Sequence, residues 1–184
     1  MTYIFRKFNP VADSSKPFDC GNSDLNGFFR ETESDVPNAT SYTEQLLAVT
    51  YVVEERETSN ILAYFSLLHD KLEREYSDAK IWNKLSRKIP NIKRRSSYPA
   101  LKIGRLAVSK NCRLSGLGTK IVHFIEALYL NFQYAGCRFI TVDSLPSAIG
   151  FYERCKFHVL KSPSTESSQE GDNTALMFFD LRSF

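Results

Sequence analysis

The feature that most constrains this chain is a pattern between residues 101 and 142, where a strand, two glycines, a helix and a second strand follow one another. Leu101 to Val108 is apolar and typical of a strand. Gly116 and Gly118 then precede an amphipathic stretch with apolar residues at helical spacing. Residues 138–142 form a short apolar run typical of a buried strand. This pattern predicts a right-handed parallel crossover over 101–142.

The rest of the chain predicts further strands and helices around this unit. The runs 46–53 and 61–68 indicate an antiparallel hairpin, whereas Pro37–Ser41 and Pro99 are interpreted as breaks. The other strands are expected at 3–8, 159–161 and 174–181, and the other helices after Ser23, over 71–88 and from Pro146. The fold class is therefore mixed α/β (α+β), with helices on both faces of a mixed sheet.

The length of 184 residues predicts one domain, 1–184. Residues 70–98 are interpreted as a helical, basic insertion of unassigned role. No apolar run approaches the roughly 20 residues that cross a bilayer, and no signal peptide is visible, so we expect a cytoplasmic protein that binds no membrane. The four cysteines show neither a CxxC pair nor cysteine–histidine ligand spacing, so no metal site is expected.

Charge is unevenly distributed, although the net charge is only +3. No Asp or Glu occurs between Ile81 and Ile125, where eleven lysines and arginines lie. Such segregation favours a positive surface that attracts anions, with a merely solvated basic face as the alternative.

Gly116 and Gly118 lack Cβ atoms where the chain turns into the helix at Thr119. A phosphate can therefore approach backbone amides that have no partner within the helix. Alone, this pattern also fits a simple tight turn. A dinucleotide-binding motif is disfavoured because the GxGxxG spacing is absent.

Residues 113–118 (Arg-Leu-Ser-Gly-Leu-Gly) resemble the (Gln/Arg)-x-x-Gly-x-(Gly/Ala) loop of the GNAT acetyltransferase superfamily. Residues 104–108 resemble that family's fourth strand, 140–143 its fifth, and 148–157 its A-x-x-F-Y-E-x-x-G-F segment. The resemblance implies a largely antiparallel GNAT-like sheet. Lys156 departs from it, because the family usually has glycine there, and this leaves the local turn geometry open.

The resemblance implies that acetyl-coenzyme A is the cosubstrate, with its diphosphate on the loop and its pantetheine arm along the strand. Amides near Leu106 and Ala107 would stabilise the developing oxyanion, and Tyr152 would protonate the leaving thiolate. The alternative for Tyr152 is a packing role. A general base is not identified: Glu54, His69 and Asp70 are candidates, and none is required for an α-amine. The implied cofactor-binding residues are Leu106, Ala107, Val108, Arg113, Leu114, Ser115, Gly116, Leu117, Gly118 and Thr119.

Within the superfamily, the chain resembles the toxins of bacterial toxin–antitoxin pairs, through residues 18–30 and 99–108. That branch acetylates the α-amine of aminoacyl-tRNA, which implies tRNA and an antitoxin as partners. A basic tract beside the motif suits an RNA backbone. The candidate RNA-binding residues are Lys84, Arg87, Lys88, Arg94 and Arg95.

Two other functions stay open at this point. The chain could acetylate a small metabolite or a protein amine, in which case an enclosed or acidic acceptor pocket is expected. It could also be a non-catalytic binding module, although both glycines and Tyr152 argue against this. Whether the chain forms a homodimer is also open.

Overall fold

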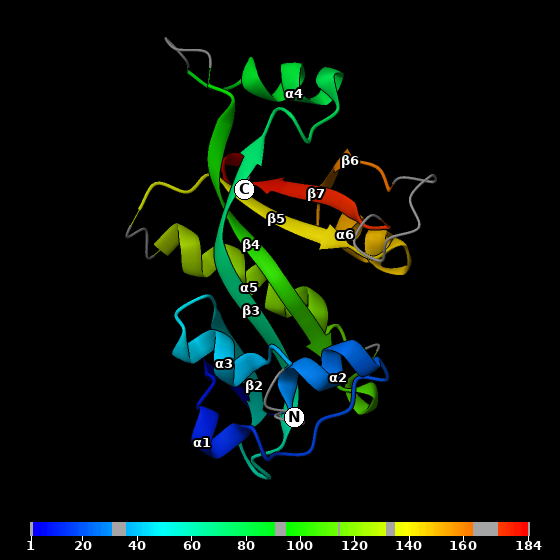
Figure 1. Ribbon diagram of the computed structural model, residues 1–184. Coiled ribbons are helices and arrows are strands. Elements are labelled where there is room, and N and C mark those ends of the chain that lie inside the picture. The colour runs from blue at the N-terminus through cyan, green and yellow to red at the C-terminus, as the bar shows by residue number, and fades with distance from the viewer. Residues whose placement is uncertain are drawn as a thin grey trace. The chain divides into compact units, whose positions relative to one another are not determined.

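A computed structural model describes residues 2–30, 36–90, 95–113, 115–131, 135–163 and 173–183. Figure 1 shows the arrangement of the elements within each part of the chain. The strands are β1 (Tyr3–Lys7), β2 (Val49–Glu55), β3 (Ile61–Glu73), β4 (Ser97–Val108), β5 (Phe139–Ser144), β6 (His158–Lys161) and β7 (Ala175–Asp180). The helices are α1 (Pro10–Asp13), α2 (Ser23–Phe29), α3 (Ala39–Glu44), α4 (Ala79–Ser86), α5 (Leu117–Asn131) and α6 (Ile149–Arg154), with short 3-10 turns η1 (Lys110–Cys112), η2 (Pro146–Ala148) and η4 (Leu181–Ser183).

The strands are hydrogen-bonded in the order β1-β2-β3-β4-β5-β7-β6. β4 and β5 run parallel, with Ala100 opposite Phe139 and Lys102 opposite Thr141. The pairs β1–β2, β2–β3, β5–β7 and β6–β7 are antiparallel. The mixed α/β class, the largely antiparallel sheet and the parallel crossover are thus confirmed.

The chain forms two compact units. The first comprises Met1–Leu68 and Ile103–His123, and the second His69–Lys102 and Phe124–Phe184. β3, β4 and α5 contribute residues to both units. The prediction of a single domain over 1–184 therefore stays a prediction.

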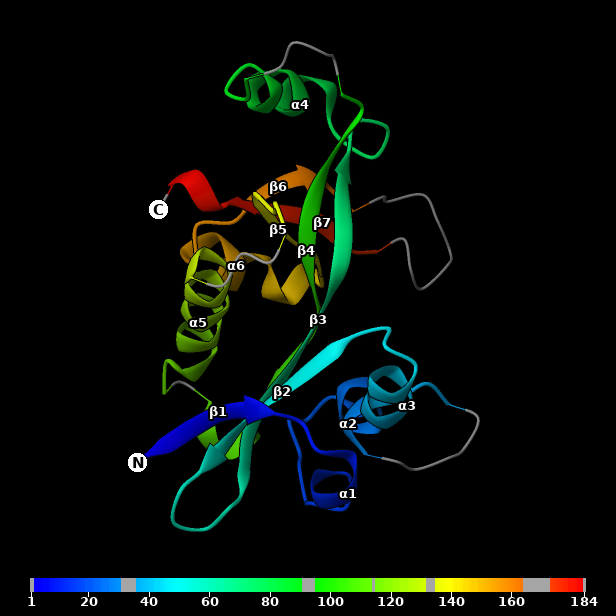
Figure 2. The same ribbon diagram turned by 90° about the vertical axis from the view of Figure 1, so that its left-hand side faces the viewer.

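Aromatic rings fill the core of the first unit, where α1, α2 and α3 lie together (Figure 2). The fully buried ring of Tyr64 on β3 stacks on Phe29 at 5.0 Å between centroids, and Phe18 contacts both rings. The Tyr64 hydroxyl donates to the Leu25 carbonyl at 2.7 Å, which satisfies the polar end of a buried phenol. α2 is thereby fixed against the hairpin of β2 and β3.

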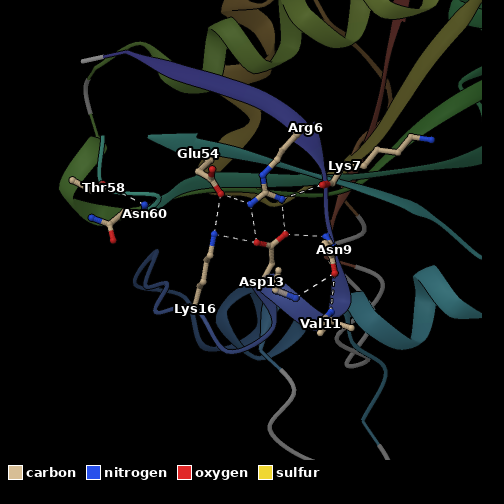
Figure 3. A network of polar contacts seen from close by, with 10 residues as sticks. Arg6, Lys7, Asn9, Val11, Asp13, Lys16, Glu54, Thr58 and Asn60 are labelled. Carbon is tan, nitrogen blue, oxygen red and sulfur yellow. Dashed lines mark hydrogen bonds and ion pairs between the residues drawn. The ribbon is translucent and has the colours of Figure 1, made fainter. Parts of the chain in front are cut away.

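A network of charges joins β1 to α1 and β2 (Figure 3). Asp13 is fully buried, and its carboxylate accepts two hydrogen bonds from the Arg6 guanidinium, at 2.6 and 2.8 Å. Arg6 also bonds Glu54, which accepts from Lys16 at 2.9 Å. Burial opposes ionisation of Asp13, but the bonds from Arg6 and from the Asn9 amide outweigh it and hold the pKa of Asp13 below its ordinary value.

The second unit is built around Trp82 of α4, which stacks on Tyr98 of β4 at 5.4 Å. The same cluster contains Leu72 of β3 and Phe139 of β5, both fully buried. Trp82 and Leu85 of α4 are buried, whereas Asn83 and Lys84 are exposed. Figure 1 shows α4 beside the point where β3 ends and β4 begins. Across the described ranges, no helix combines the length and apolar character needed to cross a membrane.

Three local predictions are wrong. The predicted helix 71–88 is a helix only over Ala79–Ser86, because β3 continues to Glu73 and buries Leu72 in the core of the second unit. The basic insertion 70–98 is therefore partly strand. Pro99 does not precede a strand but lies within β4, where it is exposed. Pro37–Ser41 is not simply a break: Asn38 caps α3, accepting from the Ser41 amide at 2.9 Å.

Candidate functional site

The predicted phosphate-binding loop joins β4 to α5 through η1, within the first unit. Gly116 has a φ of +74°, a conformation that residues with a Cβ rarely adopt. A Cβ built there meets no heavy atom of the described residues within 4 Å, its two chain neighbours aside. The Lys120 amide donates to the Gly116 carbonyl at 3.1 Å. The amides of Gly118 and Thr119 come before that bond, in the turn where amides lack a partner within the helix and stabilise anions. The backbone at this loop therefore fits a phosphate group.

The strand that leads into the loop is held very close to β3. A Cβ built on Gly104 would lie 2.6 Å from Cδ2 of Leu68 and 3.3 Å from Oγ of Ser66. Ala107, three residues further along, is 3% exposed and packs in the core of the first unit. A side chain at position 104 would require the Leu68 side chain to move, so glycine at this position of the motif leaves room for that side chain to pack.

Arg113 and Ser115 shape the loop through their side chains. The Arg113 guanidinium bonds the carbonyl of Cys20, next to Gly21, whose φ is +77°. The Ser115 hydroxyl donates to the Cys112 carbonyl at 2.6 Å. The Arg113 contact connects the loop to Cys20, which belongs to the segment 18–30 that resembles the toxin branch.

The structure brings together most of the predicted cofactor-binding residues in the first unit. Leu114 lies outside the described residues. The others lie on β4, on the loop or in the first turn of α5: Leu106, Ala107, Val108, Arg113, Ser115, Gly116, Leu117, Gly118 and Thr119. Their role as cofactor-binding residues stays a prediction.

Tyr152 lies on α6 in the second unit and is 6% exposed. Its ring contacts Phe151 at 4.9 Å and Phe157 at 5.4 Å between centroids. Burial, followed by the charge of Cys155, raises the pKa of the phenol well above its ordinary value. Tyr152 therefore keeps its proton at neutral pH, as an acid needs, although the ring contacts agree equally with a packing role.

Lys156, where the family has glycine, keeps a glycine-like conformation. Its φ is +64°, and its amide donates to the Glu153 carbonyl at 2.8 Å. The next amide, of Phe157, donates to the Tyr152 carbonyl at 3.0 Å. This pair of bonds is the Schellman motif that commonly ends a helix. The turn that ends α6 after Tyr152 is thus intact despite the lysine.

The candidate bases differ in their surroundings. Glu54 is bonded to Arg6 and Lys16, which hold the pKa of its carboxyl below the ordinary value and make it a poor base. His69 is exposed on β3. Asp70 is half-buried and accepts from the hydroxyl of fully buried Thr141 at 2.5 Å.

The predicted RNA-binding residues fall on and beside α4. Lys84 is exposed on α4, and Arg87 and Lys88 are exposed in the turn that follows the helix. Arg95 is exposed in the segment before β4, and Arg94 lies outside the described residues. The sequence analysis missed Lys80, which is also exposed. Its spacing of four residues from Lys84 was the available signal.

The sequence analysis also missed a polar hollow in the second unit, of about 280 Å³. It is lined by residues from five segments of the sequence, so no local sequence motif predicts it. Its lining residues are Asp70, Lys71, Glu73, Tyr76, Lys102, Asp143, Lys161, Ser162, Thr174 and Leu176.

Residues 49–159 match the family model described as an acetyltransferase (GNAT) domain. No curated protein matches the chain. Among solved structures, the chain is similar to one described as a bacterial toxin, with 17% identity, a TM-score of 0.75 and coverage of 99% of this chain and 92% of that one. A tyrosine-to-phenylalanine mutant of KacT matches with 22% identity, a TM-score of 0.73 and coverage of 100% and 97%. AtaT complexed with acetyl-methionyl-tRNAfMet matches with 21% identity, a TM-score of 0.73 and coverage of 99% and 96%. At these identities the likeness shows a common fold.

Proposed function

The chain belongs to the GNAT family of acetyltransferases, and on that premise we propose that it transfers the acetyl group of acetyl-coenzyme A to the α-amine of an aminoacyl-tRNA. The observation that carries the RNA part of this proposal is the outer side of α4. Lys80 and Lys84 are exposed one turn apart on α4, and Arg87 and Lys88 are exposed in the turn that follows the helix. Residues four apart share one side of a helix. A row of cations suits a phosphate backbone.

Acetyl-coenzyme A supplies a thioester whose C–S bond breaks as the new C–N bond forms. In our proposal, the amides of Gly118 and Thr119 at the start of α5 hold its diphosphate. Amides near Leu106 and Ala107 donate to the carbonyl oxygen as it gains negative charge. The Tyr152 phenol donates a proton to the departing sulfur, the attacking nitrogen releases its proton to water, and water returns a proton to the phenolate.

The α-amine is a suitable nucleophile without a strong base. Its ordinary pKa, about 7.7–8.0, leaves a substantial neutral fraction at cellular pH, whereas a lysine amine near 10.4 is almost fully protonated. This agrees with the surroundings of Glu54, whose ion pairs make it a poor base. The likeness to AtaT complexed with acetyl-methionyl-tRNAfMet supports the same acceptor class. An antitoxin partner and a homodimer stay predictions.

The test uses acetyl-coenzyme A labelled in the acetyl group. The protein is incubated with charged tRNA, with deacylated tRNA and with a panel of small amines and peptides. We expect label in the RNA fraction from charged tRNA alone. Label only in a small amine or peptide would contradict the RNA part of the proposal and leave the acetyltransferase assignment intact.

The double variant Lys84→Glu/Arg87→Glu tests the role of α4. We expect KM for charged tRNA to rise about tenfold or more and the salt dependence of KM to weaken, with the affinity for acetyl-coenzyme A unchanged. Lys7→Glu/Arg56→Glu is the matched control, because it makes the same charge change at exposed residues of the first unit. Equal effects of both double variants would mean that only net charge matters.

A further inference from the structure

The polar hollow of the second unit, which we call the Tyr76 pocket, has the chemistry of a ligand site. It adjoins a second hollow of about 350 Å³ and shares Tyr76, Lys161 and Ser162 with it. Asp78, the N-cap of α4, lines the second hollow together with Ile81. The second hollow therefore lies beside the start of α4.

Most of the charges in the Tyr76 pocket neutralise one another. Lys71 pairs with Glu73 at 2.8 Å, and Lys102 pairs with Asp143 at 2.5 Å. Two groups remain for a ligand. Asp70 uses one carboxylate oxygen to accept from Thr141. Lys161 makes no ion pair with any residue in the described part of the chain. The pocket thus offers one oriented carboxylate and one cation.

Tyr76 adds an aromatic surface to this pair of charges. Its side chain is 52% exposed, and its ring stacks on no other ring within the described ranges. A large exposed aromatic side chain between two hollows gives a nucleic-acid base a face to stack on, and such stacking contributes about 1–3 kcal/mol per base. A carboxylate, an aromatic ring and a cation side by side match an ammonium, a base and a phosphate.

We propose that the Tyr76 pocket binds the aminoacyl end of the acceptor RNA. The α-ammonium of the amino acid bonds Asp70 and then loses its proton to water to become the neutral nucleophile, the terminal base stacks on Tyr76, and a phosphate near the end of the strand contacts Lys161. This inference rests on the proposed function, since it identifies the part of the protein that recognises that acceptor. Thr141, whose hydroxyl fixes Asp70, is a positioning residue.

The probe for this pocket is puromycin, an aminoacyl nucleoside with a free α-amine, and its N-acetyl derivative is the matched ligand. Binding to the full chain is measured by titration calorimetry in the wild type, Asp70→Asn and Tyr76→Leu. We expect the wild type to bind puromycin and each variant to bind it about tenfold or more weakly, because each lacks one charged hydrogen bond or one stacking surface. N-acetylpuromycin should bind the wild type as weakly as puromycin binds Asp70→Asn.

Glu153→Gln is the control, because Glu153 is an exposed carboxylate of the same unit that lines neither hollow. Its affinity for puromycin should equal that of the wild type. Circular dichroism and thermal melting establish that Asp70→Asn and Tyr76→Leu are folded. Wild-type-like affinity in both folded variants, or no binding of puromycin by the wild type, would overturn the proposal.

Acetylation of charged tRNA by the same proteins separates this inference from the proposed function. If the wild type acetylates charged tRNA and both variants do so with unchanged KM, the Tyr76 pocket is not the acceptor site and the proposed function stands. If puromycin binding depends on Asp70 and Tyr76 but charged tRNA is never acetylated, the pocket is an aminoacyl-nucleoside site and the proposed function is wrong.

Discussion

The carboxyl group of Glu126 on α5 is 1% exposed, and the positive charge of Lys156 acts on it from the turn that follows α6. Oε2 of Glu126 has no hydrogen-bond partner within the described part of the chain. Burial raises the pKa of this carboxyl to about 7, and Lys156 reduces that rise. A buried acid and a strained lysine are thus electrostatically linked.

Glu126 should make the protein less stable as the pH rises. Its pKa is higher in the folded protein, about 7, than the ordinary 4.5 expected on unfolding, so its stabilising contribution is complete below about pH 4.5 and is lost as pH rises through 7. Glu126→Gln removes this pH-dependent contribution to the free energy of unfolding, because glutamine does not titrate. Between about pH 5 and about pH 8, we expect the free energy of unfolding of the wild type to fall by roughly 3 kcal/mol relative to the variant. Urea unfolding across this range measures the difference; parallel pH profiles would contradict the prediction.

Lys156→Gly should stabilise the turn after α6. Its φ of +64° costs a residue with a Cβ about 1–2 kcal/mol, which glycine avoids. Part of this gain is offset by the greater freedom of glycine in the unfolded chain, so a net increase of about 0.5–1 kcal/mol is expected. Lys156→Ala is the control, because it removes the charge and keeps the strain. Equal melting temperatures for the glycine and alanine variants would show that the turn is unstrained.

Gly116→Glu should abolish binding of acetyl-coenzyme A. A Cβ at position 116 meets no atom of the described residues outside its chain neighbours, but the glutamate carboxylate repels a diphosphate at the start of α5. The φ of +74° adds about 1–2 kcal/mol of strain for any residue with a Cβ. Gly116→Ala carries the strain without the charge, and titration calorimetry distinguishes the two variants. Unchanged affinity in Gly116→Glu would remove the loop from the cosubstrate site.

Tyr152→Phe should lower kcat and leave the affinity for acetyl-coenzyme A unchanged. The variant keeps the ring that packs between Phe151 and Phe157, so the fold should be preserved. Loss of general-acid assistance typically costs about 10²–10⁴-fold in rate. Steady-state kinetics and calorimetry provide the two readouts. A matching decrease in affinity and stability would instead assign the tyrosine a packing role.

Local pattern was sufficient for the central part of the fold. The run from Leu101 to the end of the fifth strand shows strand and helix periods in turn, and the parallel pairing of β4 with β5 follows from it. Helical spacing failed between residues 71 and 78, because Leu72 is buried as part of a strand and Tyr76 lies in the connection. Packing of Leu72 in the core of the second unit therefore favours strand over the helix that the local spacing predicts.

The candidate site was only partly predictable for the same reason. The glycine loop is contiguous in sequence, and its backbone has the conformation that Gly116 suggested. The Tyr76 pocket depends on Asp70, Lys102 and Lys161, which are far apart in sequence and meet only through strand pairing. The Schellman turn at Lys156 could not be predicted from the sequence either, because lysine rarely adopts the positive φ that this turn requires.

The first seven residues stabilise the fold, because they include Arg6, which pairs with the buried carboxylate of Asp13. Any shortened form that begins after Lys7 lacks the Arg6 guanidinium. The buried Asp13 carboxylate then keeps only Lys16 as an ion-pair partner among the described residues. Breaking a buried ion pair in this way costs about 3–5 kcal/mol, a large part of the stability of an ordinary domain. Poor expression of a chain shortened in this way would therefore reflect lost stability and would say nothing about its catalysis.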